Sequence, residues 1–334
     1  MRAAVVTEFN KPWEIKDLPD PRPGPGQVVV RIRASGMCAS DITAHQGYLP
    51  VRTPFVAGHE PAGEIAEIGP GVTDLKVRDR VGVSWHQKGC GRCDACQAGH
   101  SHHCLTMQTW MDVGGGNSEL MIAWASGCSL IPDGVSFEEA APIFCAGYTS
   151  MSGLRNANPK PGDRVAVLGV GGLGHLALQF AKALGLPTIG VTAQANKKKE
   201  LLELGADEVL VAGEDIGKQL MAMGGADVIL STTSDPKQVA SAFTGLRPGG
   251  RFVNMGLVHG PIPLDSMALM FPARHLIGSS QDERSDLHEA LKLVAAGKVK
   301  PKLEIYPLAQ VNEVRDRLAA GKVRYRAVLQ HGAA

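Results

Sequence analysis

Residues 164–175 read Arg-Val-Ala-Val-Leu-Gly-Val-Gly-Gly-Leu-Gly-His, an apolar run that leads straight into a cluster of glycines. The run 165–168 predicts a buried strand, and the helical periodicity of residues 175–184 predicts a helix directly after the glycines. In this context the Gly-x-Gly-x-x-Gly pattern predicts a tight turn whose backbone approaches a pyrophosphate at the helix N-terminus. A glycine-rich turn without a ligand is the competing interpretation. The expected nucleotide contacts are Gly169, Gly171, Gly172, Leu173 and Gly174.

Strands and helices continue to alternate after this turn. The sequence predicts strands over 188–192, 208–211, 227–230 and 251–255, and a further helix over 197–204. This alternation is typical of a parallel, doubly wound sheet. Upstream of the turn, the chain has short strand-like runs separated by turn signals, which predicts a β-rich domain with many loops.

The change of pattern gives the expected domain boundaries. Residues 1–147 are assigned to the β-rich domain and residues 148–278 to the doubly wound sheet. Residues 279–334, with a helix over 285–296 and a strand over 325–330, are expected to return to the β-rich domain. A chain of 334 residues is also too long for one compact core, which favours two domains.

The composition favours a small-molecule partner. With 34 basic and 33 acidic residues the formal charge is +1, so the chain lacks the charge asymmetry of proteins that bind nucleic acid or anionic membranes. Residues 1–9 lack the apolar segment of a signal peptide, and no apolar run reaches membrane-spanning length. We therefore expect a soluble, cytoplasmic protein whose seven cysteines stay reduced unless a metal binds them.

Four cysteines lie close together in the first domain, at Cys90, Cys93, Cys96 and Cys104. Four thiolates on one turn-rich segment can surround Zn²⁺ tetrahedrally and close its coordination sphere, as structural sites do. An iron–sulfur cluster fits less well, because the usual bacterial spacing places the fourth cysteine three residues on and before a proline. Disulfides would require an oxidising compartment. The segment therefore predicts a structural zinc site.

The residue at the end of the strand predicted over 188–192 helps to decide between NAD(H) and NADP(H). NAD sites commonly carry an acidic residue at the end of this strand, where it accepts hydrogen bonds from the ribose hydroxyls. That position is Thr192, and Lys197, Lys198 and Lys199 begin the next helix. With no carboxylate to repel it, a 2′-phosphate could pair with a lysine here, with Lys197 as the candidate. NADP(H) is therefore favoured over NAD(H), although a lysine triplet also suits a solvated helix face.

A second metal is indicated by residues outside the cysteine cluster. Cys38, Cys128 and Cys145 remain, and His59 stands in Gly-His-Glu-Pro-Ala-Gly over 58–63. Two thiolates and one imidazole with an open fourth position form a catalytic zinc site. Taken alone, His59 would more often be a core or surface histidine, and Cys38 or Cys145 a small buried apolar residue.

Taken in order, these motifs resemble those of the zinc-dependent alcohol dehydrogenases of the medium-chain dehydrogenase/reductase family, over almost the whole chain. The resemblance is carried by Cys38-Ala-Ser-Asp41, Gly58-His59-Glu60-Pro-Ala-Gly63, the four-cysteine segment, Cys145-Ala-Gly-Tyr-Thr149 and the turn 169–174. It implies a GroES-like β-rich catalytic domain and a Rossmann coenzyme domain. It also implies two zinc ions per chain, an alcohol or aldehyde substrate, and a homodimer or homotetramer.

The resemblance implies roles for the residues of the catalytic centre. Cys38, His59 and Cys145 match the family's catalytic zinc ligands. Glu60 matches a glutamate beside that zinc which can exchange with water as a ligand. Asp41 matches the carboxylate that orients the ligand histidine, and Ser40 matches the hydroxyl that passes on the substrate proton.

Further contacts follow from the same resemblance. Many relatives carry a histidine five residues after the first ligand to continue the proton relay, but this chain has Thr43 there. His45 would share that face only if the segment were extended. Cofactor contacts are assigned to Thr149, Leu257 and Arg284, whereas Cys128 matches nothing and is interpreted as packing.

The expected substrate pocket is lined by Trp85, His86, Trp110 and Met111, which flank the cysteine cluster. Aromatic walls favour apolar or aromatic primary or secondary alcohols over polyols. The competing interpretation is that the tryptophans only pack the β-rich domain. Other functions left open are an NADPH-dependent reductase of bulky aldehydes, ketones or imines, a zinc-free quinone or enone reductase, and a non-catalytic binding protein.

Overall fold

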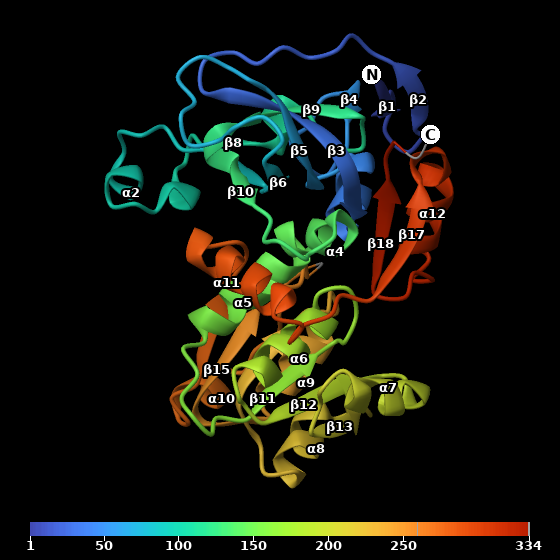
Figure 1. Cartoon of the computed structure of the whole chain (residues 1–334). Coiled ribbons are helices and arrows are strands. Elements are labelled where there is room, and N and C mark those ends of the chain that lie inside the picture. Colours follow the sequence, from blue (N-terminus) through green and yellow to red (C-terminus); the bar gives the residue numbers. More distant parts are fainter. Residues whose placement is uncertain (259, 333–334) are drawn as a thin grey trace. The chain divides into compact units, whose positions relative to one another are not determined.

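The structure is a computed structural model that describes residues 1–258 and 260–332. The chain divides into two compact units, one formed by residues 1–145 and 301–334 and the other by residues 146–300 (Figure 1). Each unit has its own sheets and its own buried apolar core. Within the described part of the chain, no helix is both long and apolar enough to cross a membrane.

The first unit is built mainly from antiparallel strands. Its seven-stranded sheet has the order β10-β6-β5-β3-β18-β17, with β9 also paired to β3. A three-stranded sheet has the order β2-β1-β4, and β7 pairs with β8. The strands are β1 (Arg2–Val6), β2 (Glu14–Asp17), β3 (Gln27–Met37), β4 (Phe55–Val56), β5 (Glu60–Ile68), β6 (Arg80–Val83), β7 (His86–Lys88), β8 (Gln108–Thr109), β9 (Leu120–Trp124), β10 (Cys128–Leu130), β17 (Leu303–Pro307) and β18 (Arg326–Gln330).

The helices of this unit are short and sit between strands. They are α1 (Ala39–His45), α2 (Asp94–Gln97), α3 (Trp110–Val113), α4 (Phe137–Ala140) and α12 (Val311–Ala319), with 3₁₀ turns η1 (Ser101–His103), η2 (Ala125–Gly127), η3 (Ala141–Phe144) and η5 (Leu308–Gln310). The start of α4 is fixed by a capping box in which Ser136 and Glu139 each accept a hydrogen bond from the other's backbone N–H. The predicted β-rich domain is confirmed.

The second unit contains one six-stranded sheet in which all neighbours are parallel. Its order is β13-β12-β11-β14-β15-β16. Strand β11, the first of the six in the chain, lies in the middle of the sheet, and the strand order reverses between β11 and β14. The strands are β11 (Val165–Leu168), β12 (Thr188–Thr192), β13 (Glu208–Val211), β14 (Ala226–Ser231), β15 (Leu246–Asn254) and β16 (His275–Gly278). The predicted doubly wound, Rossmann-type sheet is confirmed.

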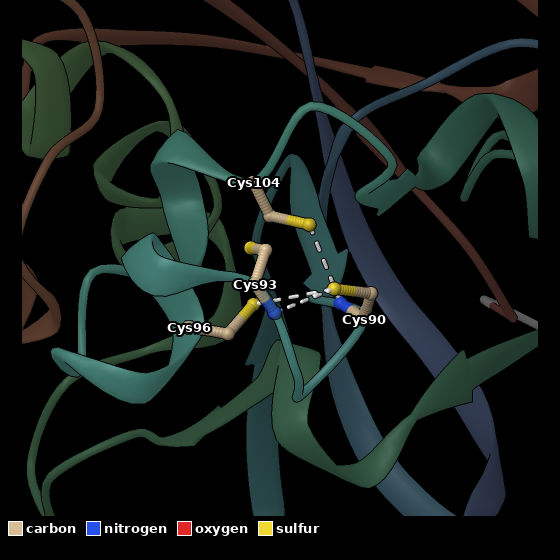
Figure 2. Close-up of side chains that lie close together, drawn as sticks. All are labelled: Cys90, Cys93, Cys96 and Cys104. Atoms are coloured by element: carbon tan, nitrogen blue, oxygen red, sulfur yellow. Dashed lines mark hydrogen bonds between the residues drawn. The ribbon is translucent and has the colours of Figure 1, made fainter.

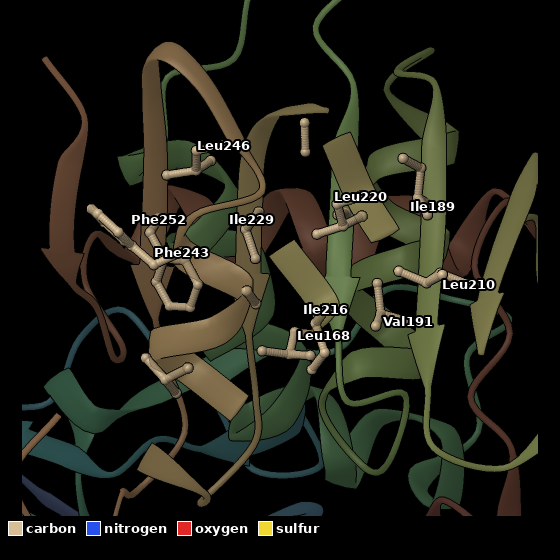
Figure 3. Packing of buried hydrophobic residues seen from close by; sticks show 14 residues of the cluster. Leu168, Ile189, Val191, Leu210, Ile216, Leu220, Ile229, Phe243, Leu246 and Phe252 are labelled. Carbon is tan, nitrogen blue, oxygen red and sulfur yellow. The ribbon is translucent and has the colours of Figure 1, made fainter. Parts of the chain in front are cut away.

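The helices of this unit alternate with its strands, and several of them pack on the sheet through apolar side chains. They are α5 (Ala146–Asn156), α6 (Gly174–Ala183), α7 (Lys198–Glu203), α8 (Ile216–Ala222), α9 (Pro236–Phe243), α10 (Ser266–Met270) and α11 (Arg284–Ala295), with the 3₁₀ turn η4 (Ala195–Lys197). Figure 3 shows Ile216 and Leu220 of α8 and Phe243 of α9 meeting the strand residues Ile229 and Phe252 in one buried cluster. Burial of this cluster holds the sheet that carries the glycine turn.

The returning segment is shorter than residues 279–334. Strand β18 pairs with β3 in the first unit, as expected. Helix α11 instead belongs to the second unit, so the expectation that this helix packs back on the first domain is wrong. The reason is its contact with α5, where the Ser152 hydroxyl donates a hydrogen bond of 2.8 Å to the buried Asp286 carboxylate.

Candidate functional site

The first candidate site lies where three segments of the first unit meet. Cys38 follows the last residue of β3, while His59 and Glu60 stand at the start of β5. Strands β3 and β5 are antiparallel, and Gly36 lies directly opposite Glu60. A Cβ on Gly36 would meet Glu60 Oε2 at 1.9 Å, so the glycine makes room for this carboxylate. Cys145 joins the group from the end of η3.

The four side chains offer ligand atoms to one point. Their ligand atoms all lie within 4.8 Å of one another, and all four residues are buried. Cys38 Sγ is 4.0 Å from Cys145 Sγ, and His59 Nε2 is 3.3 Å from Cys145 Sγ. Two thiolates on a tetrahedral zinc with Zn–S bonds of about 2.3 Å lie about 3.8 Å apart. The donor set therefore fits a zinc ion in both chemistry and spacing.

Asp41 holds the histidine of this group. Its Oδ1 lies 3.2 Å from His59 Nδ1, and the backbone N–H groups of Cys38 and Gly58 donate to the same carboxylate at 2.8 and 3.1 Å. Burial alone would lower the pKa of His59, but the Asp41 carboxylate outweighs it and raises that pKa well above its usual value. A hydrogen bond at Nδ1 leaves Nε2 as the ligand atom, as metal-binding histidines require.

The thiols of the group are electrostatically unequal. The hydrogen bond from the Cys145 thiol lowers the pKa of Cys38 well below its usual value, against the effect of burial. The buried guanidinium of Arg326 and the hydrogen bond with His59 lower it further. Cys38 is therefore the group's favoured thiolate before any ion is bound.

Arg326 also joins this buried group, a neighbour that the sequence does not predict. It is the first residue of β18 and forms an ion pair with both Oε atoms of Glu60, with side-chain exposures of 4% and 0%. Burial raises the pKa of Glu60 to about 7, while Arg326 opposes that shift. The two residues are 266 positions apart. The arginine at the start of the Arg-Ala-Val-Leu-Gln strand is the local signal of a buried charge there.

The four-cysteine segment forms the second candidate metal site. Figure 2 shows Cys90, Cys93, Cys96 and Cys104 pointing toward a common centre, and their sulfurs lie within 4.8 Å of one another. Cys90 Sγ is 4.0 Å from Cys96 Sγ and accepts a hydrogen bond from the Cys93 backbone N–H at 3.4 Å. The backbone N–H groups of Arg92 and Cys93 lower the pKa of Cys90 to about 6. Four sulfurs at this spacing fit a closed tetrahedral zinc site with no position for a substrate.

Cys93→Ser should therefore affect folding before it affects chemistry. Losing one of four thiolates weakens zinc binding, and the binding free energy of a structural zinc is folding free energy. We expect a lower thermal midpoint and one zinc fewer per chain, with turnover per correctly folded chain retained. Differential scanning fluorimetry together with zinc analysis measures this. If turnover disappears while folding and the other zinc stay intact, this cluster takes part in the chemistry.

Two aromatic side chains lie beside His59. The Trp85 ring lies 5.0 Å from the His59 ring and the Trp110 ring 6.0 Å from it, measured between centroids. Trp110 is 1% exposed, whereas Trp85 is half-buried. His86 on β7 and Met111 on α3 are also half-buried. The structure thus brings both predicted tryptophans to the metal-site histidine.

The proposed relay residues lie on helix α1. Ser40 is half-buried in the first turn, and Thr43 lies one turn further, where its hydroxyl donates to the Ala39 carbonyl at 3.1 Å. The segment is helical rather than extended, so His45 does not share the face of Thr43. His45 Nδ1 instead accepts a hydrogen bond of 3.0 Å from Trp13 Nε1. This bond holds the imidazole against the first unit's core.

The glycine turn of the second unit has the geometry of a phosphate-binding turn. Gly169 has φ +86°, a conformation that L side chains rarely adopt, and a Cβ on Gly174 would meet Gly169 O at 2.1 Å. A Cβ on Gly171 would meet nothing within 4 Å, so the backbone there is open to a ligand. Helix α6 begins at Gly174, with Leu173 as its N-cap. The residues present therefore fit a pyrophosphate at the helix N-terminus.

The other predicted cofactor residues are spread over the second unit. Thr192 ends β12 and is buried, with its hydroxyl accepting the Gln194 backbone N–H at 3.2 Å. Lys197 follows in η4 and is half-buried. Thr149 is buried on α5, Arg284 begins α11, and Leu257 after β15 is 62% exposed. The strand end next to the glycine turn thus carries a hydroxyl and a nearby lysine, and no carboxylate.

Comparisons with known proteins agree with this arrangement. Residues 24–133 match the family model "Alcohol dehydrogenase GroES-like domain", and residues 172–296 match "Zinc-binding dehydrogenase". An alcohol dehydrogenase of Geobacillus stearothermophilus is 42% identical over 335 residues, which cover 99% of each chain.

Solved structures extend the similarity to the fold. The alcohol dehydrogenase of the archaeon Aeropyrum pernix superposes with a TM-score of 0.90 at 32% identity, over 99% of this chain and 100% of the other. An acetophenone reductase of Geotrichum candidum in complex with NAD gives 0.88 at 26% identity, over 98% and 96%. The similarity spans both units, including the segments that carry the two cysteine sites.

Proposed function

We propose the reaction of this chain from its family, because it belongs to the zinc-type medium-chain alcohol dehydrogenases. The chain interconverts an apolar or aromatic alcohol and the corresponding aldehyde or ketone, and a nicotinamide dinucleotide carries the hydride. The observation that carries this proposal is the buried group of Cys38, His59 and Cys145, held by Asp41 beside two tryptophans. Two thiolates and one imidazole leave the fourth position of a zinc site open to substrate.

The proposed chemistry divides between the bound groups and the chain. When bound, zinc would supply Lewis acidity toward the substrate oxygen, and the nicotinamide would supply or accept the hydride. Asp41 keeps His59 Nε2 directed at the metal position. Ser40 is proposed to pass on the substrate proton, and Trp85 and Trp110 provide an apolar wall that limits water.

Ser40 and His45 separate two possible proton routes. Ser40→Ala should lower kcat by about 10²-fold or more, the usual contribution of a positioned proton-transfer group. His45→Ala should change kcat little, because the imidazole is bound to Trp13 on another face of α1. Steady-state kinetics of both variants measure the difference. Equal and severe losses would return His45 to the relay.

NADP(H) is the proposed cofactor. Thr192 offers no carboxylate to repel a 2′-phosphate, and Lys197 follows it within one short 3₁₀ turn. We expect kcat/KM to be higher with NADP(H) than with NAD(H). Lys197→Ala should raise KM for NADPH about tenfold, because it removes roughly one charge-assisted hydrogen bond to the 2′-phosphate. KM for NADH should stay unchanged, with Lys199→Ala, 90% exposed at its side chain, as the matched control. A clear preference of the wild type for NADH would overturn this assignment.

The substrate class is tested by a turnover screen. Short alcohols, cinnamyl-type and other aryl alcohols, and polyols should be compared in the oxidative direction, and the corresponding aldehydes and ketones in the reductive direction. The aromatic pair beside His59 favours aryl and other apolar compounds over polyols. The second candidate, an NADPH-dependent reductase of bulky aldehydes, ketones or imines, rests on the same wall. It would be preferred if reduction of bulky carbonyls far exceeds oxidation of every alcohol.

A homo-oligomer formed through the second unit is part of this proposal. Strand β16 ends the six-stranded sheet, and its Leu276 is 43% exposed. Met267, Met270 and Phe271, just before this strand, are 53%, 63% and 71% exposed. An unpaired strand edge beside exposed apolar side chains suits pairing with a second copy. Because thiolate ligands require reduced cysteines, we place the protein in the cytoplasm.

A further inference from the structure

We propose that His100, His102 and His103 form a third metal site, which binds a divalent transition-metal ion of the Ni²⁺, Cu²⁺ or Zn²⁺ class. These three histidines lie between Cys96 and Cys104 and belong to neither of the sites described above. Their side chains carry no thiolate or carboxylate chemistry, so they offer a binding site different in kind from the four-cysteine cluster. The proposal does not rest on the enzymatic function.

The backbone brings the three imidazoles together. His100 is the N-cap of η1, and its carbonyl accepts the His103 backbone N–H at 2.9 Å. A 3₁₀ turn has three residues per turn, so side chains three positions apart lie on the same face. His100 and His103 are exposed, and His102 is half-buried between them in the sequence. The turn therefore presents its imidazoles to one region of the surface of this segment.

The ring positions are close to those of imidazoles that share an ion. Ring centroids are 4.1 Å apart for His102 and His103, 5.8 Å for His100 and His102, and 6.2 Å for His100 and His103. With metal–nitrogen bonds of about 2.0 Å, two rings on one ion have centroids roughly 4.5 Å apart at a right angle and roughly 6.4 Å apart on opposite sides. His100 and His103 are exposed, so their side chains can turn toward an ion shared with His102.

The ring nitrogens lie close together in pairs, and not all three lie within 4.8 Å of one another. A ring nitrogen of His102 lies within 4.8 Å of one of His100 and within 4.8 Å of one of His103. His102 is thus the common member of both pairs. Imidazole nitrogen is a good ligand for nickel, copper and zinc, and three such ligands leave the remaining positions to water. A short histidine-rich tract of this kind is a known composition for metal binding.

A metal ion here would also stabilise the neighbouring cysteine segment. The turn that carries the histidines continues directly into Cys104, whose backbone N–H donates to the Ser101 carbonyl at 3.1 Å. An ion that binds only the folded turn shifts the unfolding equilibrium toward the folded state by mass action. Thermal unfolding of the zinc-loaded protein should therefore move to higher temperature when the third site fills.

The test is a calorimetric titration of the zinc-loaded protein with Ni²⁺, with zinc release followed in the same sample. We expect one Ni²⁺ per chain at micromolar affinity without release of zinc. His102→Ala should weaken Ni²⁺ binding by at least about tenfold. Losing a residue that only hydrogen-bonds to a metal ligand already lowers metal affinity by that factor, and losing the ligand itself should lower it at least as much. The matched control is His275→Ala, an exposed histidine on β16, which should leave the titration unchanged.

Two results would overturn the proposal. One is a titration of His102→Ala that is indistinguishable from that of the wild type; the other is Ni²⁺ uptake matched by an equal release of zinc. His100→Ala, which changes an exposed side chain, gives the same comparison if His102→Ala fails to fold. A rise in the thermal midpoint with Ni²⁺ that both ligand variants lose, and that His275→Ala keeps, supports the site.

Discussion

Cys38→Ser is expected to lower kcat/KM for alcohol oxidation by about 10³-fold or more. The sulfur of Cys38 lies 4.0 Å from Cys145 Sγ in the buried group, and a serine hydroxyl is a much poorer zinc ligand than a thiolate. Loss of Lewis acidity removes several kcal/mol of transition-state stabilisation, and each 1.36 kcal/mol corresponds to about a tenfold rate change. Steady-state kinetics with a good alcohol substrate measure the loss.

Cys128 supplies the control for this substitution. It is another buried cysteine of the same unit, 3% exposed, whose thiol lies 3.6 Å from the Trp124 carbonyl. It belongs to neither metal site, so Cys128→Ser should keep turnover near that of the wild type. Turnover of Cys38→Ser within tenfold of the wild type would contradict the assignment of the site, and so would an equal loss in both variants.

Arg326→Met is expected to destabilise the protein by about 3–5 kcal/mol, the cost of leaving one partner of a buried ion pair uncompensated. Glu60 is fully buried and its carboxylate pairs with Arg326 through both oxygen atoms. Removal of the guanidinium leaves this carboxylate with its burial cost and without its counter-charge. Chemical denaturation of the zinc-loaded protein measures the change in unfolding free energy.

A double variant separates this effect from lost packing. The double variant Glu60→Gln/Arg326→Met carries neither the buried carboxylate nor the buried guanidinium. We therefore expect the double variant to recover part of the unfolding free energy that Arg326→Met loses. Arg326→Lys, which keeps one positive charge, should fall between the wild type and Arg326→Met. If the double variant is as unstable as the sum of the two single variants, the coupling energy is zero and the ion pair does not explain the loss.

The parts of the fold that the sequence predicts are those encoded by local pattern. Strand β11, the glycine turn and α6 follow each other without interruption, and their apolar and glycine spacing identifies the Rossmann-type unit. The four cysteines of the structural site fall within one short segment, so their grouping is also visible locally. Each of these features depends on neighbours in the sequence.

The parts that the sequence does not predict depend on distant partners. The pairing of Arg326 with Glu60 joins residues 266 positions apart. It depends on β18 pairing with β3 and on β3 pairing with β5, which carries Glu60. The sequence places helix α11 in the wrong unit, because its periodicity shows an apolar face without showing what covers that face. The contact that decides this, between Ser152 and Asp286, spans 134 positions.

Helix α1 shows a third limit of local pattern. Its seven residues are too few to show a clear period, so the sequence left open whether His45 shares a face with Thr43. The backbone of the helix and the bond from Trp13 to His45 together answer this. A single tertiary hydrogen bond thus decides which way a candidate relay residue points.

We propose that this alcohol dehydrogenase holds two zinc ions per chain and that only one of them takes part in catalysis. Zinc content per chain, measured after gel filtration in metal-free buffer alongside turnover, tests it most directly. We expect two tightly held zinc ions in the wild type, and in Cys38→Ser one zinc fewer together with the loss of turnover. Fully active protein with fewer than two zinc ions per chain would contradict this proposal.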